Sequence, residues 1–165
     1  MEVRLASYTE HEAVIRLEHT HPLWNNGQTL DAWRKEVLEL WQPSGTRIYV
    51  LDLGNGEILS SLRVFQAPAY GIPDGMLGLA SLISPEKLRG KGYASKLVGE
   101  VLGLEDPREE KGVWAHAEVS PLWLERFGFK LLPDRFQEYK SSKLMLRGGR
   151  LGLLDQEDFV PPRYF

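Results

Sequence analysis

Two glycines and two cations lie close together near the middle of the chain, in the segment Arg89-Gly90-Lys91-Gly92-Tyr93-Ala94, which contains no acidic residue. The preceding residues, 76–84, are apolar or small, and residues 93–102 carry apolar side chains at helical spacing. A strand, a basic glycine loop and a helix in this order form an anion site. The reason is that N–H groups at a helix start lack backbone partners and glycines allow close approach. The pattern predicts a site for the pyrophosphate of a nucleotide-containing cofactor.

Two other phosphate-binding glycine loops fit this segment less well. A Walker A loop requires glycine directly before its lysine, but Ser95 precedes Lys96. A dinucleotide-binding fingerprint matches Gly90 and Gly92, but Ser95 stands where its third glycine should be. The sequence therefore rejects the first loop and leaves a nicotinamide-binding oxidoreductase as the weaker alternative.

The segment resembles the acetyl-CoA loop of the GNAT superfamily, the Gcn5-related N-acetyltransferases. That loop has Gln or Arg, two variable residues, Gly, one variable residue, and Gly or Ala; Arg89, Gly92 and Ala94 match it. An apolar strand ending in proline precedes the loop, as in the family, here at 82–85. The family's later strand and short helix ending in Gly-Phe are matched by residues 114–129.

This resemblance implies an α/β (α+β) fold, with a mixed, mostly antiparallel sheet flanked by helices. It implies a single acyl-CoA N-acyltransferase domain over residues 1–147, and the tail at 148–165 has no assigned role. The implied activity is transfer of an acetyl group from acetyl-CoA to a primary amine by direct attack in a ternary complex. The amine is expected to belong to a small molecule or a peptide.

The resemblance also assigns the residues that hold coenzyme A. The backbone at the end of the preceding strand would align the pantetheine and thioester, and the loop and first helical turn would bind the pyrophosphate. The cofactor-binding residues expected on this basis are Leu82, Ile83, Ser84, Arg89, Gly90, Lys91, Gly92, Tyr93, Ala94 and Ser95.

Acetyl transfer to an ammonium group requires a base, and His116 and Glu118 are the candidates. Trp114, His116 and Glu118 share one face of the strand expected at 112–119, because side chains alternate along a strand. The other face is small and apolar and is expected to pack against a helix. Either candidate could take the proton directly or through water. The alternative is that both simply lie on a polar sheet face.

Two positions depart from the family pattern. Pro85 lies four residues before Arg89 instead of three, which predicts a bulged entrance to the loop. Leu124 occupies the position of the tyrosine that donates a proton to the leaving thiolate in many members, and leucine has no proton to donate. Tyr93 and Tyr139 are alternative donors. The alternative function is therefore a catalytically inactive acyl-CoA-binding module.

Local patterns predict the elements that position these residues. Strands are expected at 3–7, 46–53, 57–66, 76–84, 112–119, 129–132 and 143–147, with a hairpin turn at 54–56. One helix is expected to begin with Thr9 and Glu12 as a capping box, and another at Thr29. The third starts at Tyr93, and a short fourth starts at Ser120. Their expected buried stripes are Ala13, Val14 and Leu17; Leu30, Trp33, Val37 and Leu40; and Ala94, Leu97, Val98, Val101 and Leu102.

Composition limits the remaining possibilities. The 165 residues suit one domain, and the net charge of −3 argues against a large nucleic-acid-binding surface. The absence of cysteine removes disulfides and thiolate zinc sites. No run approaches the roughly 18 apolar residues that span a membrane. We expect a cytoplasmic protein with no metal and no membrane partner, and we leave open whether it forms a homodimer.

Overall fold

The computed structural model describes residues 1–41, 45–66, 75–105, 112–118, 120–149 and 154. Most of the tail at 148–165 lies outside this part. The elements run in the order β1 (Glu2–Leu5), α1 (Tyr8–His19), α2 (Pro22–Asn25), α3 (Leu30–Trp41), β2 (Arg47–Asp52), β3 (Ile58–Phe65), β4 (Leu77–Ile83), η2 (Glu86–Leu88), α4 (Tyr93–Glu105), β5 (Val113–Ala117), α5 (Pro121–Glu125), β6 (Lys130–Leu131), η3 (Asp134–Phe136) and β7 (Lys143–Arg147).

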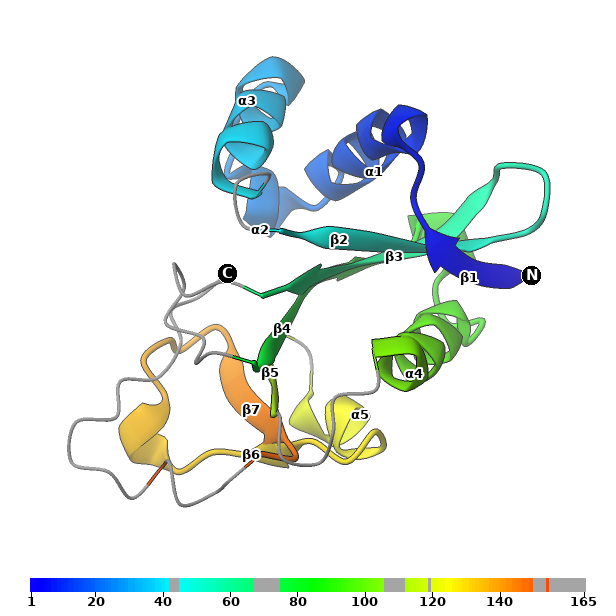
Figure 1. The fold of residues 1–165 in the computed structure, drawn as a ribbon. Coiled ribbons are helices and arrows are strands. Elements are labelled where there is room, and N and C mark those ends of the chain that lie inside the picture. Colours follow the sequence, from blue (N-terminus) through cyan, green and yellow to red (C-terminus); the bar gives the residue numbers. More distant parts are fainter. Residues whose placement is uncertain (42–44, 67–74, 106–111, 119, 150–153, 155–165) are drawn as a thin grey trace. The chain divides into compact units, whose positions relative to one another are not determined.

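The seven strands form one mixed sheet in the order β1-β2-β3-β4-β5-β7-β6 (Figure 1). Strand β4 pairs with β5 in parallel, and the pairs β1–β2, β2–β3, β5–β7 and β6–β7 are antiparallel. This confirms the expected fold class, a mostly antiparallel sheet with flanking helices.

The chain divides into two compact units. Unit 1 contains Met1–Val64 and Ser81–Leu104, and unit 2 contains Phe65–Ala80 and Glu105–Phe165. Strand β4 contributes its first four residues to unit 2 and its last three to unit 1.

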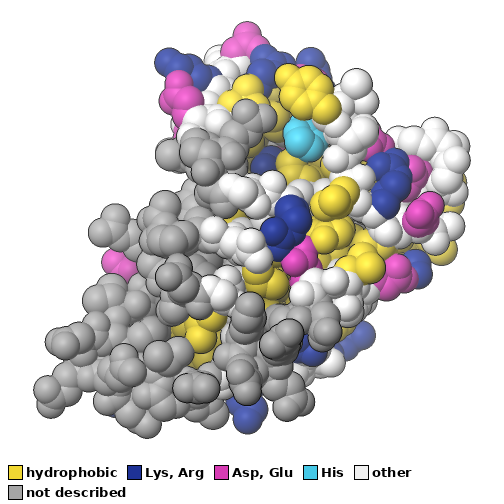
Figure 2. All heavy atoms as spheres, in the orientation of Figure 1, with side chains coloured by type: hydrophobic (Ala, Val, Ile, Leu, Met, Phe, Trp, Pro, Cys, Tyr) yellow, Lys and Arg dark blue, Asp and Glu magenta, His cyan; other side chains and the backbone are white. Residues whose placement is uncertain are grey.

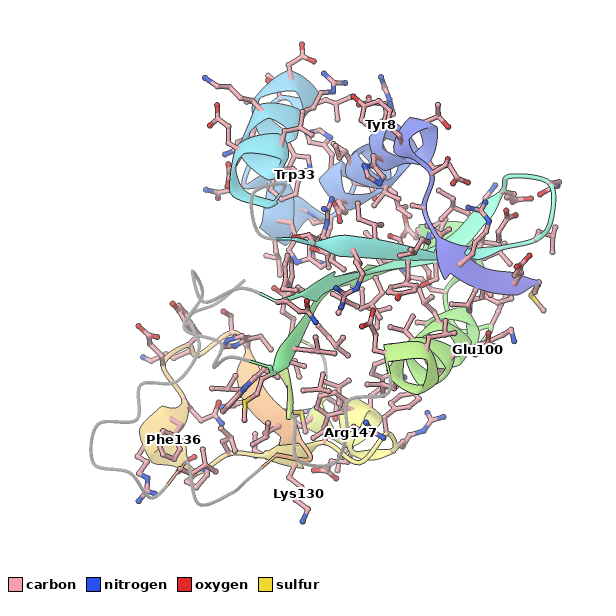
Figure 3. All side chains as sticks on the ribbon, in the orientation of Figure 1. Tyr8, Trp33, Glu100, Lys130, Phe136 and Arg147 are labelled. Carbon is pink, nitrogen blue, oxygen red and sulfur yellow. The ribbon has the colours of Figure 1, made fainter. Side chains whose placement is uncertain are left out.

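In unit 1, helices α1, α2 and α3 lie on one face of β1–β3, and α4 lies on the other (Figure 1). Val14 of α1 packs on Ile48 and Val50 of β2. Trp33 and Val37 of α3 pack with Ile15 of α1, and Figure 3 shows Trp33 on the side of α3 that faces α1. The buried stripe predicted for α4 is confirmed at Leu97, Val98, Val101 and Leu102.

Some details of the helical part were predicted wrongly. Ala13 is exposed, and Ile15 takes its expected place in the core. The sequence Trp24-Asn25-Asn26-Gly27 predicts a loop, but α2 extends to Asn25. Asn26 follows it in the left-handed conformation, with φ of 45°. The side chain of Leu40 lies outside the described part.

The outer surfaces of α1 and α3 are joined by ion pairs. Arg34 donates two hydrogen bonds to the Glu12 carboxylate, at 2.8 and 2.7 Å, and Arg16 pairs with the same carboxylate. Acidic and basic side chains are interspersed over these helices in Figure 2.

No helix in the described ranges combines the length and apolar character needed to cross a membrane.

Helix α1 begins two residues earlier than expected, and its capping box is Ser7 with Glu10. The Glu10 carboxylate accepts hydrogen bonds from the Ser7 N–H and hydroxyl, both at 2.8 Å. Glu12 is unavailable for the predicted box because it binds Arg34. Arg4 of β1 donates to Glu10 at 2.8 and 2.7 Å and also to Asp52 of β2. This network fixes the start of α1 to the first two strands.

The ion pairs of Arg4 with Glu10 and Asp52 make the free energy of unfolding depend on pH in the acid range. Hydrogen bonds from Arg4, and then from the Ser7 N–H, lower the pKa of Glu10 from 4.5 to about 2. Arg4 and the Gly54 N–H lower the pKa of Asp52. Because both carboxyl groups have lower pKa values in the folded chain, their ionised forms stabilise the fold. This stabilisation is complete above the unfolded pKa and is lost as pH falls towards the folded pKa.

We expect the free energy of unfolding, measured by urea titration, to fall between pH 4.5 and 2. The fall should be smaller in Glu10→Gln, and equal slopes in both proteins would contradict this assignment.

A buried ion pair connects α1 to β3. The Arg63 guanidinium donates to both carboxylate oxygens of Glu18, Nε at 2.6 Å and Nη2 at 2.7 Å. Both side chains are almost completely buried, with exposed fractions of 4% and 1%. Two opposite charges satisfy each other here through a bidentate contact within unit 1.

Replacement of one residue of the Glu18–Arg63 pair should strongly destabilise the fold. In Glu18→Gln the Arg63 cation stays in the interior without its carboxylate, so we expect the free energy of unfolding to fall by about 3–5 kcal/mol. Urea unfolding at neutral pH measures the change.

The matched control for Glu18→Gln is Glu39→Gln, which breaks the exposed Lys35–Glu39 pair of α3. The control should cost less than about 1 kcal/mol. The double variant Glu18→Leu/Arg63→Met should recover most of the loss. Equal losses in the free energy of unfolding for Glu18→Gln and the control would show that the buried pair contributes no more to stability than an exposed pair.

Unit 2 is built around β5 and β7. Trp114 of β5 is fully buried, and its indole N–H lies 3.1 Å from the Met76 sulfur. The amide of Gln137 donates to the carbonyls of Leu132 and Leu144 and accepts from the Leu144 N–H, which ties the segment after β6 to β7. Arg147, labelled in Figure 3, donates to the Phe127 carbonyl at 2.9 Å and so holds the end of β7 to the turn after α5.

Candidate functional site

The last residues of β4 lead to the glycine loop. Ser81 has φ of 50°, a left-handed conformation that is rare for a residue with a side chain. The Ser84 hydroxyl donates to the Ser60 hydroxyl of β3 at 3.0 Å, and the Ser60 hydroxyl in turn donates to the Ile83 carbonyl at 3.0 Å. All three of these residues are buried. A chain of serine hydroxyls, which the sequence did not reveal, therefore fixes the end of β4 to β3.

The extra residue between Pro85 and Arg89 is absorbed by a short 3₁₀ turn, η2. Arg89 follows it with extended backbone, φ of −64° and ψ of 155°. Its N–H donates to the Glu86 carbonyl at 3.1 Å, and its Nε lies 3.4 Å from the Ser84 carbonyl. Arg89 and Lys91 are both exposed. The entrance to the loop is thus a turn, and it leaves both cations at the surface.

Gly90 and Gly92 both adopt left-handed backbone, with φ of 76° and 82°. Residues with side chains rarely adopt this conformation, so the loop requires glycine here. A Cβ atom built at either position would meet no heavy atom within 4 Å. The space beside both glycines is therefore open.

Helix α4 starts directly after this open space. The Gly92 carbonyl accepts the Lys96 N–H at 3.0 Å, which places Tyr93, Ala94 and Ser95 in the first turn. The N–H groups of a first turn have no intrahelical partner and carry the positive end of the helix dipole. No acidic residue lies in this first turn. Lys96 forms an ion pair with Glu100, which Figure 3 labels on α4.

The predicted cofactor-binding residues gather in one place within unit 1. Leu82, Ile83 and Ser84 lead directly to the turn, and residues 89–95 form the loop and the first turn of α4. His116 and Glu118 belong to unit 2 instead.

The polar face expected for β5 is only partly present. Trp114 belongs to the core of unit 2, while His116 and Glu118 are half-buried. Strand β5 lies between β4 and β7 in the sheet. On the face expected to be polar, the large side chain of Trp114 near the start of β5 is buried. His116 is the second-last residue of β5, and Glu118 lies just beyond the strand's end at Ala117.

His116 contacts two side chains from the segment that ends in β7. The Ser142 hydroxyl lies 3.4 Å from His116 Nδ1, and Ser142 is 2% exposed. The ring of Tyr139 meets the imidazole edge-on, with ring centroids 5.8 Å apart and an interplanar angle of 82°. Sequence reasoning named Tyr139 but missed Ser142. The antiparallel register of β5 and β7, with Ala117 opposite Lys143, brings Ser142 to His116.

Leu124 is buried in α5, with 6% of its surface exposed. As predicted, Ser120 precedes the helix and Pro121 is its first residue. Gly128 lies beyond its end with φ of 83°. The residue at the family's tyrosine position therefore contributes to the core of unit 2.

His19 is the last residue of α1, and His21 is the N-cap residue of α2. His19 Nε2 lies 2.9 Å from the Gln28 carbonyl, and the His21 ring stacks on Trp24 with centroids 4.4 Å apart. Within the described ranges, no group of three or more His, Asp or Glu side chains is arranged to hold a metal ion. The side chain of Trp41 lies outside the described part.

Solved structures of GNAT-family acetyltransferases share this fold. A GNAT-family acetyltransferase from Staphylococcus aureus Mu50 has a TM-score of 0.64 and 12% identity, covering 90% of this chain and 99% of that chain. A GNAT-family acetyltransferase from Brucella melitensis, in complex with acetyl-CoA, has a TM-score of 0.62 and 15% identity, covering 87% and 85%. The PaiA N-acetyltransferase from Thermoplasma acidophilum, in complex with coenzyme A, has a TM-score of 0.62 and 11% identity, covering 89% and 98%.

The chain therefore has the fold of the GNAT-family acetyltransferases. The likeness lies in the structure, because no protein-family model matches the sequence and no curated protein matches it.

Proposed function

We propose that this protein is an acetyl-CoA-dependent N-acetyltransferase acting on a primary amine of a small molecule or peptide. The observation that carries the proposal is the open glycine loop at the start of α4, in a chain with the GNAT fold. We assign the activity to residues 1–147 and leave the tail at 148–165 without a role.

The loop fits the diphosphate of coenzyme A in shape and charge. The N–H groups of residues 92–95 would donate to phosphate oxygens, and the glycines would allow the phosphates to approach the backbone. The exposed Arg89 and Lys91 side chains would add charge-assisted hydrogen bonds. The Ser95 hydroxyl lies in the same first turn and would supply one more donor.

The backbone of Leu82, Ile83 and Ser84 would align the pantetheine arm. This part of β4 is fixed by the hydroxyls of Ser60 and Ser84, so its backbone is held in place before the ligand arrives. A fixed backbone is suited to alignment because it loses little freedom on binding.

Acetyl-CoA supplies the acetyl group as a thioester, whose carbonyl carbon is attacked by the amine nitrogen so that a C–N bond forms and the C–S bond breaks. The attacking nitrogen must first lose its ammonium proton, and His116 or Glu118 would accept it directly or through water. After the attack the nitrogen releases its second proton to water as the amide forms, and the leaving thiolate takes a proton from water or from a tyrosine such as Tyr139.

A catalytically inactive acyl-CoA-binding module is the second candidate function. It is favoured by Leu124, whose buried side chain offers no proton at the family's tyrosine position. Both candidates require coenzyme A binding, and they differ in turnover.

Two measurements separate these candidates. Calorimetry should show binding of coenzyme A in preference to NAD. Thiol release from acetyl-CoA should then exceed the background rate with at least one amine from a panel of amino acids, polyamines, aminoglycosides and lysine-containing peptides. Binding without release from any amine would favour the inactive module, and binding of NAD alone would overturn both.

A further inference from the structure

The turn between β2 and β3 (Figure 1) holds an asparagine that is arranged to react with its own backbone. Asn55 is followed by Gly56, and both residues are exposed. The backbone nitrogen after an asparagine can attack the side-chain amide carbon, Cγ, because the two atoms close a succinimide ring. Glycine hinders this attack least, since it has no side chain. The chain contains two Asn-Gly sequences, one here and one at Asn26-Gly27.

Asp52 places a carboxylate at the attacking nitrogen. The Gly56 N–H donates to Asp52 Oδ1 at 3.2 Å, and the Gly54 N–H donates to the same oxygen at 2.7 Å. Arg4 binds the other oxygen, Oδ2. Hydrogen bonds from Arg4 and the Gly54 N–H lower the pKa of Asp52, so the group is ionised at neutral pH. A carboxylate that accepts this N–H polarises the bond and can take its proton as the nitrogen attacks.

A second backbone group polarises the amide carbon of Asn55. The Glu57 N–H donates to Asn55 Oδ1 at 3.0 Å. Negative charge gathers on this oxygen when the nitrogen adds to Cγ, so a donor already in place stabilises the tetrahedral intermediate. Glu57 is itself fixed, because its carbonyl accepts the Leu53 N–H at 3.3 Å. The turn therefore provides a nucleophile, a base and an oxyanion donor around one amide group.

Asn26 lacks this arrangement although glycine also follows it. The Gly27 N–H donates to the neutral amide oxygen of Asn25 at 2.8 Å, so its acceptor carries no charge. Among the described residues, none donates a hydrogen bond to the Asn26 amide oxygen. The two Asn-Gly sequences thus differ in the groups that surround them, and the chain carries its own comparison.

We propose that Asn55 is a self-modification site, at which the folded chain converts asparagine to aspartate and isoaspartate with water as the co-reactant. In the first step a bond forms between Gly56 N and Asn55 Cγ and the Cγ–Nδ2 bond breaks. Ammonia leaves with the proton that Gly56 N gave up, relayed by the Asp52 carboxylate. In the second step water opens the ring. Hydrolysis at Cγ gives aspartate, and hydrolysis at the main-chain carbonyl gives isoaspartate. The reaction involves neither coenzyme A nor an amine, so it is independent of the proposed acetyl transfer.

Peptide mass spectrometry of the full chain measures the reaction. The chain has three asparagines, and trypsin separates them, because Asn55 falls in the peptide 48–63 and the other two fall in the peptide 17–34. The chain is incubated at mildly alkaline pH, once folded and once unfolded in guanidinium chloride. In the folded chain we expect Asn55 to react about tenfold faster than Asn26. We also expect Asn55 to react about tenfold faster in the folded chain than in the unfolded one. A flexible chain reaches the ring geometry more easily, so acceleration by folding requires the catalytic groups of the turn.

Two variants test the role of the carboxylate. Asp52→Ser keeps an oxygen that can accept the N–H groups of the turn, removes the charge, and should slow the reaction of Asn55 about tenfold. The matched control is Glu10→Gln, which also removes an acidic partner of Arg4 but lies outside the turn. The control should leave the rate unchanged, and circular dichroism verifies that both variants fold.

The comparison within the unmodified chain requires no variant. A rate at Asn55 no higher than at Asn26, or no higher in the folded chain than in the unfolded chain, would overturn the proposal. An unchanged rate in Asp52→Ser, or equal slowing in Asp52→Ser and Glu10→Gln, would overturn the assignment of Asp52 as the base.

Discussion

Replacement of Gly92 by glutamate is expected to abolish coenzyme A binding, with an increase in Kd of at least about 100-fold. The carboxylate would extend into the open space at the start of α4 and take the position proposed for the phosphates. A negative charge there also interacts favourably with the helix dipole, so the side chain would compete with the ligand from within the chain. Calorimetry with coenzyme A measures the effect.

The chain offers a matched control for this change. Gly56 in the β2–β3 turn has the same φ of 82°, and a Cβ there also meets nothing within 4 Å. Gly56→Glu therefore imposes the same backbone strain, about 1–3 kcal/mol, and adds the same charge at a place remote in sequence from the loop. It should bind coenzyme A normally. Retention of micromolar affinity by Gly92→Glu would place the coenzyme A site elsewhere.

Loss of the general base is expected to lower kcat by about 10²–10⁴-fold, because positioned proton transfer typically contributes that much. His116→Gln and Glu118→Gln remove the two candidates one at a time while keeping side chains of similar size. The variant that removes the base should lose turnover with no change in Kd for coenzyme A, since both residues lie outside the loop.

Glu125→Gln is the control for these two variants, because Glu125 is an exposed acid on α5 in the same unit. It should retain full activity. A tenfold or smaller loss in both His116→Gln and Glu118→Gln would show that neither residue is the base. A large loss in both would indicate a proton relay through the pair.

The glycine loop was predictable because its signals are local. Gly90 and Gly92 adopt the left-handed backbone that only glycine adopts easily, and the apolar spacing of residues 97–102 describes the buried side of α4. Gly54 and Gly56 likewise have positive φ in the hairpin turn expected at 54–56. Each signal depends on residues within one or two turns of chain.

The errors come from competition between equally good local signals. Ser7 with Glu10 and Thr9 with Glu12 both fit a capping box. The choice depends on distant cations, because Arg4 binds Glu10 and Arg34 binds Glu12. The order of Pro22 after His21 was a sign of a helix start that the loop interpretation overlooked. Trp114 was assigned to a polar face because alternation alone does not show that β5 is buried on both sides.

The contacts between distant segments were beyond local patterns. His116 and Ser142 are 26 residues apart, and their meeting depends on the register of β5 with β7. Ser60 holds the end of β4 across a separation of more than 20 residues. Such pairs require the topology of the sheet, which propensity and periodicity do not specify.

The Glu18–Arg63 pair has a consequence for how this protein changes over evolutionary time. The two residues lie 45 positions apart, yet loss of either one alone leaves a charge in the interior. A lineage that replaces one must pass through a poorly folded ancestor unless the second change follows quickly. Two apolar residues together would be tolerated. Positions 18 and 63 should therefore change together, so that related chains carry both charged residues or neither.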